Sequence, residues 1–401
     1  MAMGNNSNKT PAVPLLNWLC ADGRRAADLQ ALLDEFCRRA NLAGLSVARA
    51  ALHIQTLHPL VLGHSHTWER QIPATREVNW KHGAREEPVY TQSPLRVVFE
   101  DGKVVRRQLD IKTPIMDFPI LEDLRAKGMT DYIIIPLNAI GNLRNAVSFA
   151  TDRPGGFTAS DLTAIDAVIP VLSLVVELLS AARIARTLLD TYVGRSAGRR
   201  VLDGTIRRGS GEIINAIIWF CDMRDSTSLS ESLTSERMIA TLNEFFETMA
   251  EPVQRHGGEI LKFIGDGFLA IFRADADGVA PNSCHAYAAA REANAAMAAL
   301  NAARTARGDD AIGHGLSLHV GPVMYGNIGA PDRLDFTVIG PAVNLAARLE
   351  QLTKTLGETL IMSTEFAAIC PMPKRPLGRH ALRGLAEPVA VFGVPEELTA
   401  F

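Results

Sequence analysis

The chain has 401 residues, of which 47% are hydrophobic and 21% charged, and its formal net charge is −3. This length suggests two or three domains, the composition is ordinary for a globular protein, and the charge gives no sign of a nucleic-acid partner. The five cysteines are scattered without a C-x-x-C pair, which argues against structural disulfides and a zinc cluster and favours a reducing compartment. We find no signal peptide, and the most apolar run, residues 167–179, is too short to span a bilayer. We therefore expect a cytoplasmic protein without a membrane span.

The N-terminal part of the sequence predicts a flexible tail, residues 1–25, and a mixed α/β domain, residues 26–185. Residues 26–40 carry apolar side chains at helical spacing, and residues 46–53 alternate as a strand does. Residues 57–130 contain turns and prolines and show no clear periodicity.

Two apolar segments and a long helix follow. Residues 131–137 and 145–151 predict strands that residues 138–144 join as a hairpin. Thr158 is placed to cap a long helix, with a kink expected at Pro170. A strand hairpin, a capped turn and a long exit helix resemble the end of a GAF-type small-molecule sensor domain. The resemblance implies a regulatory domain with an unidentified ligand, and the alternative is an α+β domain without one.

Four histidines lie in this region: His53, His58, His64 and His66. His64 and His66 would share one face of a strand, where they could form a metal or haem ligand pair. No cysteine or carboxylate spacing supports a metal site, so we interpret all four as core or surface histidines.

The long helix continues through residues 172–189. Its apolar residues near heptad spacing are Leu172, Val175, Val176, Leu179, Ala182, Ala185 and Leu189. We expect them to form a seam between two chains, and the alternative is a helix packed on its own domain. Residues 186–211 predict a helical, basic linker, whose arginines indicate a solvated connector rather than a nucleic-acid site.

The second domain, residues 212–401, is organised around the segment Gly265-Asp266-Gly267. Apolar runs flank this segment, which predicts a β-hairpin with a carboxylate at its tip. Asp222 ends another apolar run, residues 213–220. Two aspartates at the tips of neighbouring strands would make a hard oxygen site suited to Mg²⁺ and a polyphosphate.

Strands and helices alternate through the rest of this domain, which predicts an α+β sheet covered by helices on one side. The expected elements are helices at 234–256, at 284–307 and from Pro341, strands at 315–320, 336–339, 359–362 and 389–394, and a turn at 326–329.

Seven segments, taken in order, resemble the class III nucleotide cyclases of the bacterial type. They are FCDMR (220–224), GGE (257–259) with KFIGDG (262–267), HVGPV (319–323), GNIG (326–329), TVIG (337–340), VNLAARL (343–349) and LRGLAEP (382–388). The resemblance implies a catalytic domain with a ferredoxin-like βαββαβ core that converts ATP to 3′,5′-cyclic AMP and pyrophosphate.

The resemblance also implies roles for particular residues. Asp222, with Met223, and Asp266 would hold two Mg²⁺ or Mn²⁺ ions. Asn344 would hold the ribose, and Arg348 would stabilise charge on the reacting phosphorus.

Base recognition would rest on Lys262, which can donate to adenine N1, and on Thr337, which can accept from the 6-amino group; this pair favours ATP over GTP. Triphosphate contacts would come from the backbone N–H groups of Met223, Arg224, Asp225, Ser226 and Thr227, and from Arg383.

In this family the site forms between two catalytic domains, so we expect a head-to-tail homodimer. One chain would supply Asp222 and Asp266, and the other would supply Lys262, Thr337, Asn344 and Arg348. The sequence departs from the family at Asp225, where a glycine is frequent, and at Thr337, where many relatives have aspartate. The alternatives are a guanylate cyclase and a catalytically weak nucleotide-binding signalling module.

Overall fold

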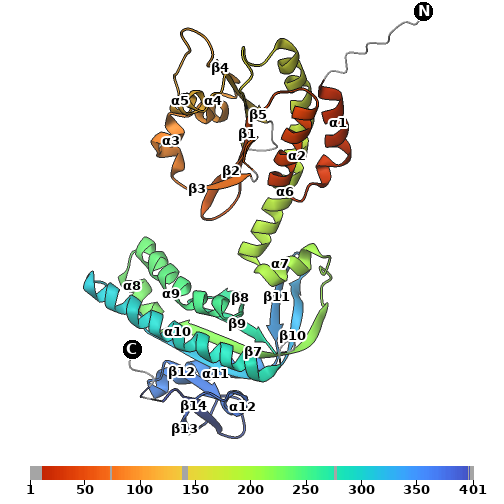
Figure 1. Cartoon of the computed structure of the whole chain (residues 1–401). Helices are drawn as coiled ribbons and strands as arrows, with labels where there is room; N and C mark the ends of the chain where they lie inside the picture. The colour runs from red at the N-terminus through yellow and green to blue at the C-terminus, as the bar shows by residue number, and fades with distance from the viewer. Residues whose placement is uncertain (1–10, 73–74, 138–142, 275–277, 396, 398–401) are drawn as a thin grey trace, which may run out of the picture. The chain divides into compact units, whose positions relative to one another are not determined.

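The computed structural model describes residues 11–72, 75–137, 143–274, 278–395 and 397 (Figure 1). The chain divides into two compact units between Leu188 and Leu189. Each unit has its own sheet.

The N-terminal unit is built on a six-stranded antiparallel sheet with the order β3-β2-β1-β6-β5-β4. Its strands are β1 (Arg49–Gln55), β2 (Val61–Glu69), β3 (Arg76–Lys81), β4 (Val105–Gln108), β5 (Asp131–Leu137) and β6 (Asn145–Thr151). Its helices are α1 (Ala12–Ala21), η1 (Gly23–Arg25), α2 (Leu29–Leu42), η2 (Ala84–Glu86), α3 (Pro88–Thr91), α4 (Pro94–Asp101), α5 (Pro119–Ala126) and α6 (Ala159–Tyr192). The predicted strand pair β5–β6 is confirmed, although residues 138–142 of the expected connection lie outside the described residues.

Both faces of this sheet are buried, which explains why β5 reads as a continuous apolar run. Ile133 and Ile135 point into a cluster shared with α1, α2 and α6. Tyr132 and Ile134, on the other face, join a cluster shared with α4 and α5.

Helix α6 begins at the predicted cap. The Thr158 hydroxyl accepts from the Asp161 N–H (3.2 Å), and the Asp161 carboxylate accepts from the Thr158 N–H (2.9 Å), so the two residues cap the helix reciprocally. By length and composition this 34-residue helix is apolar enough to cross a membrane. The apolar run of residues 167–179, from which the sequence analysis expected no membrane span, is only part of it. The buried core helix of a globular unit passes the same test, and α6 packs one side into its own core.

The expected two-chain seam is wrong in its first half. Leu172, Val175 and Val176 are buried in the core of the N-terminal unit, because this side of α6 faces the sheet. The apolar residues that α6 exposes here are Leu174 (65%) and Leu178 (54%), four residues apart on another side.

Of the histidines in β1 and β2, His64 and His66 are buried and His53 is partly buried. Burial lowers the pKa of His53 to about 3 and that of His64 to about 4, and it also lowers the pKa of His66. Arg183 of α6 adds to the effect at His64 and His66. Within the described residues, no group of three or more His, Cys, Asp or Glu side chains could hold a metal ion.

These neutral histidines predict acid sensitivity of the N-terminal unit. A folded-state pKa below the unfolded value means that the unfolded chain binds more protons, so stability is complete above about pH 6.5 and is lost as the pH falls. At pH 5.5 the loss should be about 1 kcal/mol for each of His53 and His64. His64 Nε2 has no hydrogen-bond partner among the described residues, so His64→Leu should reduce the pH dependence of thermal unfolding without removing a hydrogen bond at that nitrogen. The control His82→Leu removes an exposed histidine; an equal change in both variants would contradict the explanation.

The C-terminal unit is built on an eight-stranded sheet with the order β13-β14-β12-β10-β7-β9-β8, and β11 pairs with β10. Its strands are β7 (Gly211–Met223), β8 (Glu259–Ile264), β9 (Gly267–Arg273), β10 (His314–Ala330), β11 (Arg333–Ile339), β12 (Leu360–Ser363), β13 (Arg375–His380) and β14 (Val389–Gly393). Its helices are α7 (Arg195–Leu202), α8 (Ser226–Ser232), α9 (Ser235–Arg255), α10 (Val279–Ala306), α11 (Pro341–Leu356) and α12 (Thr364–Ile369). The succession β7-α9-β8-β9-α10-β10, with β7 and β9 central, is the expected βαββαβ core.

Helices cover both faces of this sheet, so the expectation of one covered side is wrong. One cluster joins α9, α10 and α12 to the face that carries Trp219. A second cluster joins α7 and α11 to the face that carries Ile218. Alternate residues of β7 therefore meet different layers of helices.

Part of the basic linker packs on the sheet instead of being a solvated connector. Ala197 of α7 is buried, and Arg200 forms an ion pair with Glu212 (2.8 Å). The Arg200 guanidinium also lies 5.0 Å from the centre of the Tyr325 ring.

The expected turn at residues 326–329 is also wrong, because these residues continue β10 and pair with β11. Gly326 lies opposite Gly211, and a Cβ on Gly326 would lie 2.3 Å from the Ser210 carbonyl oxygen. The glycine permits close backbone approach, not a reversal of the chain.

Candidate active site

The structure brings Asp222 and Asp266 together, as the sequence predicts. Asp222 lies near the end of β7, opposite Gly267 of β9, and Asp266 lies at the tip of the β8–β9 hairpin. The Met223 N–H donates to the Asp266 carbonyl oxygen (3.2 Å), which ties the hairpin tip to the strand. Burial, and next the nearby Asp266 carboxylate, raise the pKa of Asp222 to about 6.

Gly267 makes this close approach possible. A Cβ at this position would lie 2.2 Å from the Cys221 carbonyl oxygen and 2.6 Å from Asp222 Oδ1. Any larger residue would therefore separate the hairpin from β7 and displace the Asp222 carboxylate.

The placement of these two aspartates at adjacent strand ends is the observation that fits a divalent cation. A cation between them would offset the charge that burial makes unfavourable. Mg²⁺ is commonly held by one or two carboxylates, with water and substrate phosphates as its other ligands, so a pair of aspartates is a sufficient protein contribution.

The predicted phosphate-binding segment is partly used within the chain. The Met223 and Arg224 N–H groups donate to the carbonyl oxygens of Asp266 and Gly313. The Arg224 guanidinium donates to the carbonyl oxygen of Glu358. The prediction of phosphate binding therefore depends on the backbone N–H groups of Asp225, Ser226 and Thr227, at the start of α8.

Asp225 occupies a position that suits glycine. Its φ of 58° lies in the left-handed region, which glycine adopts without strain and aspartate tolerates. The Asp225 carboxylate accepts from Lys354 Nζ (2.7 Å), and this hydrogen bond lowers the pKa of Asp225. Lys354 therefore offsets the extra negative charge that the sequence places beside the expected triphosphate. Both side chains are largely exposed, so the pair adds little stability.

A second group of predicted residues lies in a different hollow. Lys262 of β8 and Asn344 of α11 line a cavity of about 520 Å³, together with Phe220 and Ile339. Neither Asp222 nor Asp266 lines this cavity.

The remaining predicted residues lie on β11, on α11 and in the C-terminal loop. Thr337 of β11 is buried, and its hydroxyl has no hydrogen-bond partner in the described part of the chain. Arg348 of α11 extends toward Gly384, where a Cβ would lie 3.3 Å from Arg348 Nη2. Arg348 therefore lies beside the segment that contains Arg383.

Part of the C-terminal unit is similar to known proteins. Residues 210–369 match the family described as the adenylate and guanylate cyclase catalytic domain. These residues form a class III nucleotide cyclase catalytic domain. Family members generally use two divalent metal ions, which suits the aspartate pair.

Two curated relatives have named activities. Adenylate cyclase 1 of Rhizobium meliloti is 32% identical over 179 residues, which are 44% of this chain and 26% of that protein. The adenylate cyclase of Anabaena cylindrica is 30% identical over 197 residues, which are 49% of this chain and 38% of that protein. The matched part of the chain thus spans well under half of either relative. Among solved structures, the adenylyl cyclase CyaB from P. aeruginosa is 27% identical, covers 47% of this chain and 96% of that chain, and has a TM-score of 0.43.

Glu350 is a residue of the cyclase domain that the sequence analysis missed. Burial, and next the Asp222 carboxylate, raise the pKa of Glu350 to about 7. A Cβ on Gly315, the β10 partner of Asp222, would lie 2.5 Å from Glu350 Oε1. Glu350 therefore lies beneath the aspartate pair. The one signal in the sequence was that Glu350 follows Arg348 by two residues on the same helix. Residues two apart on a helix lie on different faces, so this spacing did not indicate a shared site.

Gly267 gives a test of the site's geometry. Gly267→Ala should separate the hairpin from β7 and destabilise the cyclase domain by about 1–3 kcal/mol, as expected when a methyl group is forced into a packed region. It should also weaken Mn²⁺ binding, measured by calorimetry. Gly265→Ala is the matched control, because its methyl would enter open space and add only left-handed backbone strain of about 1 kcal/mol. Equal Mn²⁺ affinity in the two variants would show that Gly267 does not position the aspartates.

Proposed function

We propose that this chain is an adenylate cyclase that converts ATP to 3′,5′-cyclic AMP and pyrophosphate. The observation that carries the proposal is the contact between Asp222 and Asp266 at adjacent strand ends of a cyclase domain. The two named relatives, both adenylate cyclases, support the choice of nucleotide. Regulation by the N-terminal unit and a cytoplasmic location are further parts of the proposal.

In this reaction the 3′-hydroxyl oxygen bonds to the α-phosphorus, the bond from that phosphorus to the pyrophosphate oxygen breaks, and the hydroxyl proton leaves to solvent. Two divalent ions, when bound, would lower the pKa of the hydroxyl and neutralise the leaving pyrophosphate. Asp222 and Asp266 would hold these ions, with Met223 at the same strand end. Arg348 would stabilise the charge on the reacting phosphate with its planar guanidinium.

Base selection would depend on Lys262 and Thr337. The Lys262 ammonium has only donors and suits the adenine N1 acceptor. The unpartnered, buried Thr337 hydroxyl can accept from the 6-amino group, which would satisfy it. A guanine site would be expected to carry an acidic residue at position 262. Asn344, which lines the same cavity as Lys262, would bind the ribose.

The separation of the two residue groups supports a site shared between chains. Asp222 and Asp266 do not line the cavity that holds Lys262 and Asn344. A head-to-tail homodimer would place the cavity of one chain against the aspartates of the other, forming two equivalent sites.

Turnover by the purified chain tests the activity. ATP with Mn²⁺ or Mg²⁺ should give cyclic AMP, and GTP should react more slowly. Asp222→Asn should lower kcat by about a hundredfold or more, because the remaining carboxylate cannot hold both ions, whereas Asp332→Asn, an exposed turn residue, should retain activity. ATP binding without product under either metal would favour a binding module, and faster turnover of GTP would indicate a guanylate cyclase.

Mixing two inactive chains tests the shared site. Asp222→Ala and Arg348→Ala chains should each be inactive alone. Their mixture should regain about a quarter of the parental activity, because half of the randomly formed dimers are mixed and each mixed dimer has one intact site. No recovery from a mixture that native mass spectrometry shows to contain mixed dimers would contradict the arrangement.

A further inference from the structure

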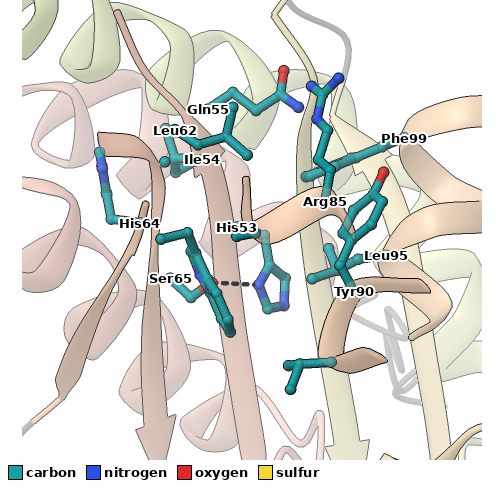
Figure 2. Close-up of a pocket in the computed structure, with 14 residues that line it drawn as sticks. His53, Ile54, Gln55, Leu62, His64, Ser65, Arg85, Tyr90, Leu95 and Phe99 are labelled. Carbon is teal, nitrogen blue, oxygen red and sulfur yellow. Dashed lines mark hydrogen bonds between the residues drawn. The ribbon is translucent and has the colours of Figure 1, made fainter. Parts of the chain in front are cut away.

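The N-terminal unit contains a cavity that the catalytic proposal does not use. It lies between β1, β2 and β3 on one side and η2, α3 and α4 on the other, and it measures about 50 Å³ (Figure 2). This volume is far below that of pockets for drug-sized ligands. A ligand must therefore be small, and part of it must lie in the mouth of the cavity.

The cavity wall is mainly apolar and aromatic. Trp80, Tyr90 and Phe99 contribute rings, and Leu62 and Leu95 contribute aliphatic surface. In Figure 2, Tyr90, Leu95 and Phe99 lie on one side of the cavity and His53 and Ser65 on the other. Flat aromatic surfaces favour a planar ring as the occupant.

A hydrogen-bond relay places one polar donor in this wall. Trp80 Nε1–H donates to Ser65 Oγ (2.9 Å), and Ser65 Oγ lies 2.8 Å from His53 Nδ1. Because Trp80 can only donate, the Ser65 hydroxyl satisfies both neighbours by accepting from Trp80 and donating to His53. The neutral His53 ring then carries its proton on Nε2, which has no partner among the described residues and can donate to a ligand. If His53 instead carried its proton on Nδ1, the Ser65 hydroxyl would accept from both Trp80 and His53. Its own proton would then need another acceptor.

An arginine lies at the mouth of the cavity. Arg85 is exposed and lines the cavity, and Figure 2 shows its guanidinium near Gln55 and Phe99. No ion pair of Arg85 occurs among the residues that the structure describes. Glu100, the acid beside Tyr90, is instead paired with Arg96 (3.1 Å). A free guanidinium beside an apolar cavity suits a carboxylate, which it can bind through two hydrogen bonds.

We propose that this cavity binds a small aromatic or heteroaromatic carboxylate, with its ring against Tyr90 and Trp80, an acceptor at His53 Nε2 and its carboxylate at Arg85. The ring removes apolar wall surface from water, and the polar groups at the two ends fix its direction. The proposal concerns the N-terminal unit alone and does not depend on the reaction of the cyclase domain.

Calorimetric titration of the full chain without nucleotide tests the proposal. The probes are 4-hydroxybenzoate, 3-hydroxybenzoate and nicotinate, with neutral 4-hydroxybenzamide as the charge control. At least one carboxylate should bind saturably and at least tenfold more tightly than the amide.

Three variants locate the binding. Arg85→Met should weaken carboxylate binding by about tenfold or more, the usual effect of losing a charge-assisted pair, and Val89→Trp should abolish it by filling the mouth. Val89 is 62% exposed, so the larger side chain should not prevent folding, which thermal unfolding checks. Arg24→Met is the matched control, because it removes an exposed arginine elsewhere in the same unit.

Absence of saturable binding by all three carboxylates would overturn the proposal. Unchanged affinity in Val89→Trp would place the binding elsewhere and would also overturn it. Unchanged affinity in Arg85→Met would refute the anionic class of ligand. Because the readout is heat of binding, a cyclase domain without turnover would leave each of these conclusions intact.

Discussion

The cyclase domain depends on holding two like charges together at the ends of adjacent strands. Asp222 and Asp266 are brought together by backbone pairing between β7 and the β8–β9 hairpin, and Gly267 removes the side chain that would keep them apart. Burial, and next the Asp266 carboxylate, raise the pKa of Asp222, so the fold holds this carboxylate where its charged form is disfavoured. Such an arrangement is unfavourable for the free protein and favourable for binding cations. The position of β7 between β9 and β10 supplies the backbone hydrogen bonds that hold it.

Helix α11 extends this constraint to the rest of the site. Asn344 and Arg348 are four residues apart and share one face of the helix, whereas Glu350 lies on another face, near Asp222. One helix therefore presents the predicted ribose and phosphate contacts outward and supports the aspartate pair inward. The Asp225–Lys354 pair, which also involves α11, offsets the charge of Asp225.

The sheet of the N-terminal unit, like that of the cyclase domain, is covered by helices on both faces. One face packs on α1, α2 and α6, and the other packs on α4 and α5, with the small cavity at the β1–β3 side. On the opposite face of β3, one of the strands that line this cavity, Glu77 accepts from Arg183 of the long helix α6 (2.7 Å). A change in the cavity and a change in α6 would therefore both act on β3. The likeness of this unit to GAF-type domains stays a prediction.

The sequence by itself determined the elements with strong local patterns: the strands β5 and β6, the Thr158 cap, the β8–β9 hairpin and the aspartates at its tip and at the end of β7. These features depend on alternation, capping and turn chemistry between near neighbours, which a single sequence displays. Tertiary structure alone decided that Leu172 and Val176 face their own core, that Gly326 lies in a strand, and that helices cover both faces of the second sheet. It also placed Glu350 beneath Asp222 and His53 in a cavity wall. Each of these features depends on which distant segment of the chain packs against the residue. The local pattern of apolar residues is the same whichever segment packs there, so it cannot identify that segment.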